Sequence, residues 1–289
     1  MSSNVFIRID GLPNDSEINA LSGDGTTLAL TRNISSSSYC ETMLLRDGVL
    51  RRAYCPKNGE STIARILSFD GRTLLVEYWN PEKLPGPRAA LVQDGSIDIL
   101  APFGKETLSA ISSRGEFLSS NGLIVAGSAY DDVEWKIKPF IKEAGKPMRS
   151  ISGPLLLKNA SVSLSAMSSS GLAFAGLSTS SCYLDVPWLF FSGRYELLLT
   201  DVERNSKLVV CFVSNDARVI FGHVLRCNGD SDPFIARDGQ IVFINEIISG
   251  KSDFWITDIL GCLEDGSCVL CSGYDKDLGC HLIIANIAW

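Results

Sequence analysis

The sequence lacks the features that identify several large classes of protein. Its formal net charge is −7, its pI is near 5.0, and its basic residues form no stripe beyond the pair Arg51-Arg52. This composition argues against a nucleic-acid-binding protein, which would need a basic surface. No apolar stretch approaches the roughly 18 residues that a membrane-spanning helix requires. We therefore expect neither nucleic acid nor a membrane as a partner.

Catalytic motifs are also scarce. The two histidines, His223 and His281, do not lie near a nucleophile motif such as G-x-S-x-G. The first strands of the repeats predicted below contain Glu17 and Asp258 as their only carboxylates. This indicates neither an acid–base pair nor a central metal site. The sequence favours a protein that is not an enzyme and that carries no cofactor.

A secretory leader is absent from the start of the sequence. The first residues, MSSNVFIRIDGLPND, contain no basic segment followed by an apolar run of 7–15 residues. The nine cysteines, an odd number, are then expected to be reduced thiols that pack as small apolar side chains. We expect a monomeric, cytoplasmic protein.

What the sequence does contain is a repeated turn of the form Ser-x-Asp-Gly. It occurs in LSGDGTTLALT (21–31) and LSFDGRTLLVEYW (67–79), and four weaker copies follow. Ser and Asp side chains hydrogen-bond to nearby backbone groups, and Gly accepts a positive φ. Aligned on this turn, the copies are 44 to 56 residues apart, with turn positions at Gly25, Gly71, Gly115, Gly171, Ala217 and Gly266. The residues three positions earlier are Ser22, Ser68, Ser112, Ser168, Ser214 and Leu263.

A second turn follows the first by 22 to 24 residues in most copies. It is Asp47-Gly48, Asp94-Gly95, Ser192-Gly193 and Asp238-Gly239, and the third copy has Gly145 in a longer segment. Short β-type runs lie between the turns, so each copy of about 46 residues predicts four antiparallel strands. A four-stranded sheet repeated at this period is typical of a β-propeller blade.

The two ends of the sequence complete the predicted architecture. The sixth copy stops at Trp289 without a fourth strand, whereas an additional strand, VFIRIDGL, is expected at 5–12. We predict a single all-β domain, a six-bladed propeller of four-stranded antiparallel blades, closed by the N-terminal strand joining the last blade. The predicted repeats are 13–60, 61–106, 107–160, 161–206, 207–254 and 255–289 plus 5–12.

Three phrases in the repeats resemble one propeller family. SSSGLAFAG (168–176), SNDARVIFG (214–222) and NGLIVAG (121–127) are similar to the bacterial HAF-type propeller repeats, as are DVPWLFFSG and DPFIARDG in the second half of a repeat. Repeats 1, 2 and 6 lack the glycine after the second strand. The resemblance implies a propeller but no common activity, because fold does not determine function.

Two segments of the sequence weakly indicate a metal site. Cys268 and Cys271 have the spacing of a zinc-ligand pair and lie near Cys262, Cys280 and His281. In a strand, however, residues three apart point to opposite faces. Asn228, Asp230 and Asp232 resemble the start of a calcium loop. This segment, however, lacks the Gly and the distal Glu that complete such a loop. Packing and a solvated polar loop are the favoured interpretations.

The loops between the predicted second and third strands are rich in aromatic and acidic residues. Tyr and Trp anchor protein interfaces, and acidic rims select basic partners. We therefore predict a protein-binding module that engages one partner with a basic patch; an inhibitor or immunity-type protein is one concrete form. A carbohydrate-binding propeller and a hydrolase of unfamiliar type are the alternatives. The predicted binding residues, centred on repeats 2 and 3, are Trp79, Tyr130, Asp131, Asp132, Trp135, Tyr183 and Asp185.

Overall fold

The computed structural model of the chain contains, within the residues that it describes, β-strands and one short helix, α1 (Ile244–Ile248). The residues that it describes are 12–13, 15–34, 39–57, 59–84, 86–100, 112–131, 136–152, 161–179, 185–198, 206–226, 228–237, 240–248, 254–262, 265, 267–275 and 280–286. In these ranges no helix is long and apolar enough to cross a membrane. The chain divides into two compact units, 1–100 and 101–289, and each is described by itself.

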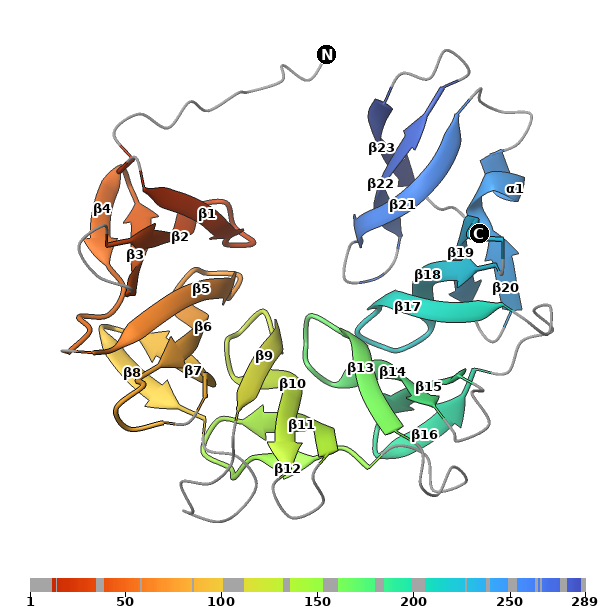
Figure 1. The fold of residues 1–289 in the computed structure, drawn as a ribbon. Helices are drawn as coiled ribbons and strands as arrows, with labels where there is room; N and C mark the ends of the chain where they lie inside the picture. Colours follow the sequence, from red (N-terminus) through yellow and green to blue (C-terminus); the bar gives the residue numbers. More distant parts are fainter. Residues whose placement is uncertain are drawn as a thin grey trace. The chain divides into compact units, whose positions relative to one another are not determined.

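The first unit contains two four-stranded antiparallel sheets, in which each strand pairs with the next along the chain (Figure 1). Sheet 1 consists of β1 (Ser16–Leu21), β2 (Thr27–Asn33), β3 (Cys40–Arg46) and β4 (Val49–Arg52). Sheet 2 consists of β5 (Ser61–Leu67), β6 (Thr73–Trp79), β7 (Arg88–Gln93) and β8 (Ser96–Ile99).

The second unit contains four sheets built in the same way. Sheet 3 consists of β9 (Ser113–Leu118), β10 (Ile124–Asp131), β11 (Lys136–Glu143) and β12 (Arg149–Ser150). Sheet 4 consists of β13 (Ser161–Met167), β14 (Ala173–Thr179), β15 (Asp185–Phe191) and β16 (Arg194–Leu197). Sheet 5 consists of β17 (Lys207–Val213), β18 (Val219–Leu225), β19 (Ser231–Arg237) and β20 (Gln240–Phe243). Sheet 6 consists of β21 (Trp255–Cys262), β22 (Cys268–Tyr274) and β23 (Cys280–Asn286).

This topology confirms the predicted all-β class and the number of sheets. Five sheets have four strands in chain order, and the sixth has three, as expected from the missing last strand. A six-bladed propeller contains sheets of this kind. The predicted closing strand, residues 5–12, lies almost entirely outside the described residues, with only Leu12 inside them.

The core lies between successive sheets. Second strands are the most buried: all but the last residue of β14 and of β18 are buried. In the first unit, Ala29 and Leu30 of sheet 1 and Leu75 of sheet 2 are 0% exposed. Because sheets cover both faces of these strands, they read as continuous apolar runs rather than as an alternation.

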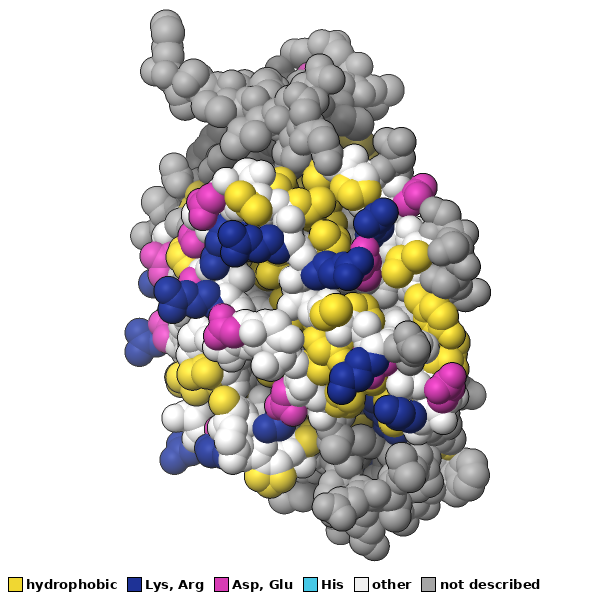
Figure 2. Space-filling model, turned by 90° about the vertical axis from the view of Figure 1, so that its left-hand side faces the viewer, with side chains coloured by type: hydrophobic (Ala, Val, Ile, Leu, Met, Phe, Trp, Pro, Cys, Tyr) yellow, Lys and Arg dark blue, Asp and Glu magenta, His cyan; other side chains and the backbone are white. Residues whose placement is uncertain are grey.

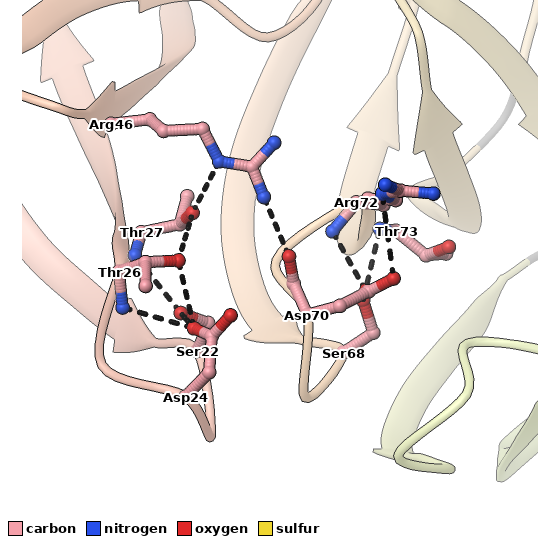
Figure 3. A network of polar contacts seen from close by, with 9 residues as sticks. All are labelled: Ser22, Asp24, Thr26, Thr27, Arg46, Ser68, Asp70, Arg72 and Thr73. Atoms are coloured by element: carbon pink, nitrogen blue, oxygen red, sulfur yellow. Dashed lines mark hydrogen bonds and ion pairs between the residues drawn. The ribbon is translucent and has the colours of Figure 1, made fainter.

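The repeated turn is built around a buried serine. The Ser22 hydroxyl accepts a hydrogen bond from the Thr27 backbone N–H at 2.9 Å and donates one to the Asp24 carboxylate at 2.6 Å. That carboxylate also accepts the Thr26 N–H at 2.9 Å. Figure 3 shows this arrangement beside its copy in the next sheet. The serine therefore satisfies a strand N–H that has no partner in the ladder.

The same bond recurs in every sheet whose turn is fully described. Each serine is at most 2% exposed, and its hydroxyl accepts the backbone N–H five residues later at 2.9 to 3.0 Å. The serines are Ser22, Ser68, Ser119, Ser168 and Ser214. In sheet 6 the corresponding Leu263 and Gly266 lie outside the described residues, although the Asp265 carboxylate accepts the Ser267 N–H at 2.9 Å.

The third repeat corrects the sequence alignment. Ser112 and Gly115 were predicted to form its turn, but Gly115 lies inside β9, opposite Gly127. The turn is seven residues later, where Ser119 accepts the Ile124 N–H and Gly122 has φ +72°. Both segments contain Ser and Gly at the right spacing, and only the pairing of β9 with β10 distinguishes them. The turn positions are then 46 to 51 residues apart.

All six first strands carry a β-bulge six residues before the turn position. In sheet 1 the pairing shifts between Ile18 and Ala20, and the other five sheets shift at the equivalent place. A bulge inserts one residue and increases the local twist. The inserted residues are Asn19, Arg65, Glu116, Ser165, Cys211 and Leu260. Glu116 is thus a first-strand carboxylate that the sequence alignment missed.

The second turns also follow the prediction where they are described. Both central residues have positive φ in Asp47-Gly48, Asp94-Gly95 and Ser192-Gly193. These values define type I′ hairpin turns, whose twist suits antiparallel strands. Asp238 and Gly239 lie outside the described residues.

Successive sheets within each unit are joined through their first turns. The Asp24 N–H donates to the Phe69 carbonyl at 2.9 Å, and the Ser120 N–H donates to the Ser169 carbonyl at 2.7 Å. The Asn215 side chain accepts the Ser170 N–H at 2.8 Å. Arg46, at the end of β3, donates to Thr27 at 2.9 Å and to the Asp70 carbonyl at 2.5 Å, which links sheet 1 to sheet 2 (Figure 3).

The structural alignment predicts which serine stabilises the third repeat. Replacing Ser119 with Ala should lower the free energy of unfolding by about 1–3 kcal/mol, because a buried N–H loses its acceptor. Ser112→Ala should change it by less than about 0.5 kcal/mol, since no turn depends on that hydroxyl. Urea denaturation of both variants measures the difference, and equal losses would contradict the revised turn.

The link made by Arg46 predicts a second difference. Arg46→Ala should destabilise the protein by about 1 kcal/mol, because two hydrogen bonds between turn residues are lost. Arg51→Ala is the matched control, since Arg51 is exposed and has no hydrogen-bond or ion-pair partner within the described part of the chain. Thermal unfolding should separate them; similar midpoints would show that the link contributes nothing.

Candidate functional site

The predicted binding residues lie at one end of the sheets where they are described. In each four-stranded sheet the first-to-second and third-to-fourth strand connections are at one end, the turn end, and the second-to-third connection is at the other, the loop end. In sheet 6 the second-to-third connection likewise lies opposite the first turn. Trp79 is the last residue of β6, Asp131 is the last residue of β10, and Asp185 is the first of β15. Tyr130 pairs with Ile137 beside the same connection. The strand pairing therefore places all four at loop ends, as predicted.

The remaining predicted residues are not described. Asp132, Trp135 and Tyr183 lie outside the described residues, as do the side chains of Asp131 and Asp185. Trp79 belongs to the first unit, whereas Tyr130 belongs to the second.

Sheet 6 presents an aromatic cluster that sequence reasoning missed. Trp255 is 55% exposed at the start of β21, and its cross-strand neighbour Tyr274 is 40% exposed at the end of β22. Phe254 precedes them and is 36% exposed, and Leu225 ends β18 of sheet 5 at 39%. The binding residues predicted from the sequence include none of these three aromatics. The signal was two adjacent aromatics at the start of a first strand, where one of them must face away from the core.

Exposed aromatic side chains favour the loop end in general. Among the described residues, the exposed aromatics at this end are Trp79, Phe254, Trp255 and Tyr274. Phe69 is the one described aromatic that is exposed at the turn end. Isolated exposed Leu and Ile side chains occur at both ends and need no special explanation. The aromatic bias therefore distinguishes the two ends.

Trp79 lies beside a small pocket in the first unit. The pocket has a volume of about 280 Å³ and is lined by Ser61, Ile63, Glu77, Trp79 and Pro87. Glu77 forms an ion pair of 2.5 Å with Arg65, the inserted residue of the bulge in β5. An exposed indole can stack on the apolar face of a sugar ring, and the neighbouring carboxylate can accept hydrogen bonds from the hydroxyl groups of that sugar.

The cysteine cluster has the character of packed thiols. Cys271 is fully buried, and burial raises the pKa of both Cys271 and Cys262 to about 11. Such thiols are protonated at neutral pH and are poor nucleophiles. No group of three or more His, Cys, Asp or Glu residues in the described ranges could hold a metal ion. In the segment that resembles the start of a calcium loop, Asp232 forms an ion pair with Arg226 at 2.6 Å.

His223 is a buried connection between strands. Its Nε2 lies 3.2 Å from Asp258 Oδ1 of β21, and its Nδ1 lies 3.1 Å from the Ser231 hydroxyl of β19. Burial lowers the pKa of His223, which the Asp258 carboxylate opposes. Cys211 is a poor nucleophile, because burial raises the pKa of its thiol to about 11. These groups have the surroundings of structural residues.

Charged residues of both signs are interspersed on the surface drawn in Figure 2. Lys and Arg side chains alternate there with Asp and Glu side chains, and hydrophobic side chains lie between them. This face has no continuous basic stripe of the kind that binds a phosphate backbone.

Comparison with known proteins identifies the fold but no family. No protein-family model matches the sequence, and no curated protein matches it. The β-propeller domain of the trilobed protease from Pyrococcus furiosus superimposes with a TM-score of 0.59 at 13% identity, covering 93% of this chain and 78% of that one. A prolyl endopeptidase structure has a TM-score of 0.60 at 11% identity, covering 93% of this chain and 42% of the other.

A structure of acylaminoacyl peptidase has a TM-score of 0.56 at 12% identity and covers 93% of this chain. This chain spans less than half the length of that peptidase, 43%, and of the prolyl endopeptidase, 42%. At such identities the likeness extends to the fold alone. The chain has a β-propeller fold that resembles the propeller domains of proteases.

Proposed function

We propose that this propeller is a binding module, not an enzyme, and that it engages a protein partner through the loop ends of its sheets. The observation that carries the proposal is the gathering of exposed aromatics there, above all the paired Trp255 and Tyr274. Large aromatic side chains are costly to leave in water and supply much of the binding energy of interfaces. Of the residues predicted from the sequence, Trp79, Tyr130, Asp131 and Asp185 lie at the loop ends of their own sheets.

Charge specifies the kind of partner. The net charge of −7 and the loop-end carboxylates Asp131 and Asp185 favour a partner with a basic patch, whose approach they would accelerate. The loops also differ in sequence from sheet to sheet, which suits one large asymmetric partner. An inhibitor or immunity-type protein, monomeric and cytoplasmic, built from HAF-type repeats, is the concrete form that we propose.

The pocket beside Trp79 supports a second candidate, a carbohydrate-binding propeller. The indole and Glu77 provide an apolar platform and a hydrogen-bond acceptor in one place. A glycan array distinguishes the two candidates: binding that is abolished by Trp79→Ala would favour the carbohydrate.

The protein-binding proposal predicts a strong asymmetry between the two ends of the sheets. With the partner isolated from the native host, Trp255→Ala combined with Tyr274→Ala should weaken binding at least about 30-fold, since truncating an interface aromatic costs about 2 kcal/mol. Calorimetric titration measures the change.

The control is a pair of exposed residues at the turn ends. Leu123 is 53% exposed and Leu172 is 59% exposed, and Leu123→Ala with Leu172→Ala should leave the affinity within about threefold. Equal losses in both pairs, or none in the aromatic pair, would show that the partner binds elsewhere.

A further inference from the structure

A larger pocket lies between sheets 4 and 5, near the turn ends. Its volume is about 730 Å³, which is within the range of small-molecule sites. One wall comes from β15 and β16, and the other comes from sheet 5 and its first turn. The pocket lies wholly within the second unit and uses none of the loop-end residues.

Cross-strand pairing explains how each wall is formed. Leu189 pairs with Glu196 and Phe191 pairs with Arg194, so these four side chains point to the same face of sheet 4. On sheet 5, Ile220, Ala236 and Ile241 stand opposite one another on three neighbouring strands. The result is a space with apolar walls and a charged margin, to which β16 and the first turn of sheet 5 both contribute.

The equivalent place between sheets 1 and 2 is smaller and differently filled. Its volume is about 360 Å³, and Arg46 bridges the two sheets across it (Figure 3). Phe191 occupies the position of Arg46 in sheet 4, immediately before the type I′ turn, and makes no such bridge. The pocket between sheets 4 and 5 is therefore a larger version of the one between sheets 1 and 2, with a phenylalanine in place of the bridging arginine.

Ala217 is a second difference between sheet 5 and the other described sheets. It has φ +62° at the turn position where the other described sheets have glycine, and its side chain lines the pocket. A side chain in the left-handed region costs roughly 1 kcal/mol. Non-glycine residues in such conformations cluster at functional sites. The Ala217 methyl group therefore lines this wall although the backbone conformation there would favour glycine.

The charged side chains at the margin of the pocket differ in whether they already have hydrogen-bond partners. The Asp216 carboxylate accepts hydrogen bonds from the Ser214 hydroxyl at 2.7 Å and from the Arg218 N–H at 3.1 Å. Arg194 and Glu196 are exposed, and neither meets a hydrogen-bond or ion-pair partner within the part of the chain that the structure describes. Arg194 is therefore a cation available beside apolar walls.

We propose that this pocket binds an amphipathic monoanion, with its apolar body between Phe191 and Ile220 and its acidic group at Arg194. A guanidinium holds a carboxylate by two parallel hydrogen bonds, which are stronger than those between neutral groups. Burial of the hydrocarbon body between the apolar walls removes apolar surface from water and so makes the free energy of binding more favourable. Glu196 lies two residues from Arg194 on the same face and repels an anion.

The experiment uses laurate as the probe, below its micelle concentration, and calorimetric titration of the full chain. The expected result is saturable binding of one molecule. Arg194→Ala should weaken it about tenfold or more, because a charge-assisted hydrogen bond is lost. Glu196→Gln should bind as tightly or more tightly, and Arg51→Ala, which removes an arginine from the other unit, should bind as the parent does.

A second variant tests the pocket itself. Ala236→Phe adds a ring within the apolar wall and should weaken laurate binding at least about tenfold. If it does not fold, as its melting curve would show, Ile241→Trp tests the same wall. Absence of saturable binding, several weak sites, or binding insensitive to both Arg194→Ala and the wall variant would overturn the proposal. None of these results bears on the loop-end surface.

Discussion

A single hydrogen bond organises the structure: the one that a buried serine hydroxyl accepts from the backbone five residues later. In Ser22 and its four described counterparts it closes the first turn and supplies the N–H of the second strand with an acceptor. Leaving that N–H unpaired in the core would cost more than most single contacts contribute. This turn sets the register between the first and second strands. A β-bulge lies six residues before the turn position in all six sheets.

Once the turn is uniform, differences between sheets become informative. Arg46 joins two turns across a small pocket in the first unit, whereas Phe191 at the equivalent position lines a larger pocket in the second. Gly71 would place a Cβ within 2.6 Å of Thr27, whereas the turn of sheet 5 holds Ala217. Stacked repeats bury a common core, so substitutions at their margins can change the surface without changing the fold.

The two ends of the sheets then have different chemistry. The turn ends carry serine and aspartate side chains whose polar groups are bonded within the turns, and Phe69 is the one described aromatic exposed there. The loop ends carry Trp79, Trp255 and Tyr274, whose exposed rings have no such internal role. Protease propellers share the fold, yet at 11–13% identity their activities do not extend to this chain. Function must be argued from these side chains.

The sequence by itself determined the number of sheets, their strand order and the serine turns, because each depends on residues close together in the chain. It misplaced the turn of the third repeat, since Ser112-Gly115 and Ser119-Gly122 have the same spacing and only the pairing of Gly115 with Gly127 separates them. The exposure of Trp255 and the pocket beside Arg194 were decided by tertiary structure alone. Which face of a strand stays uncovered depends on the size of side chains in the neighbouring sheet, and that sheet lies tens of residues away.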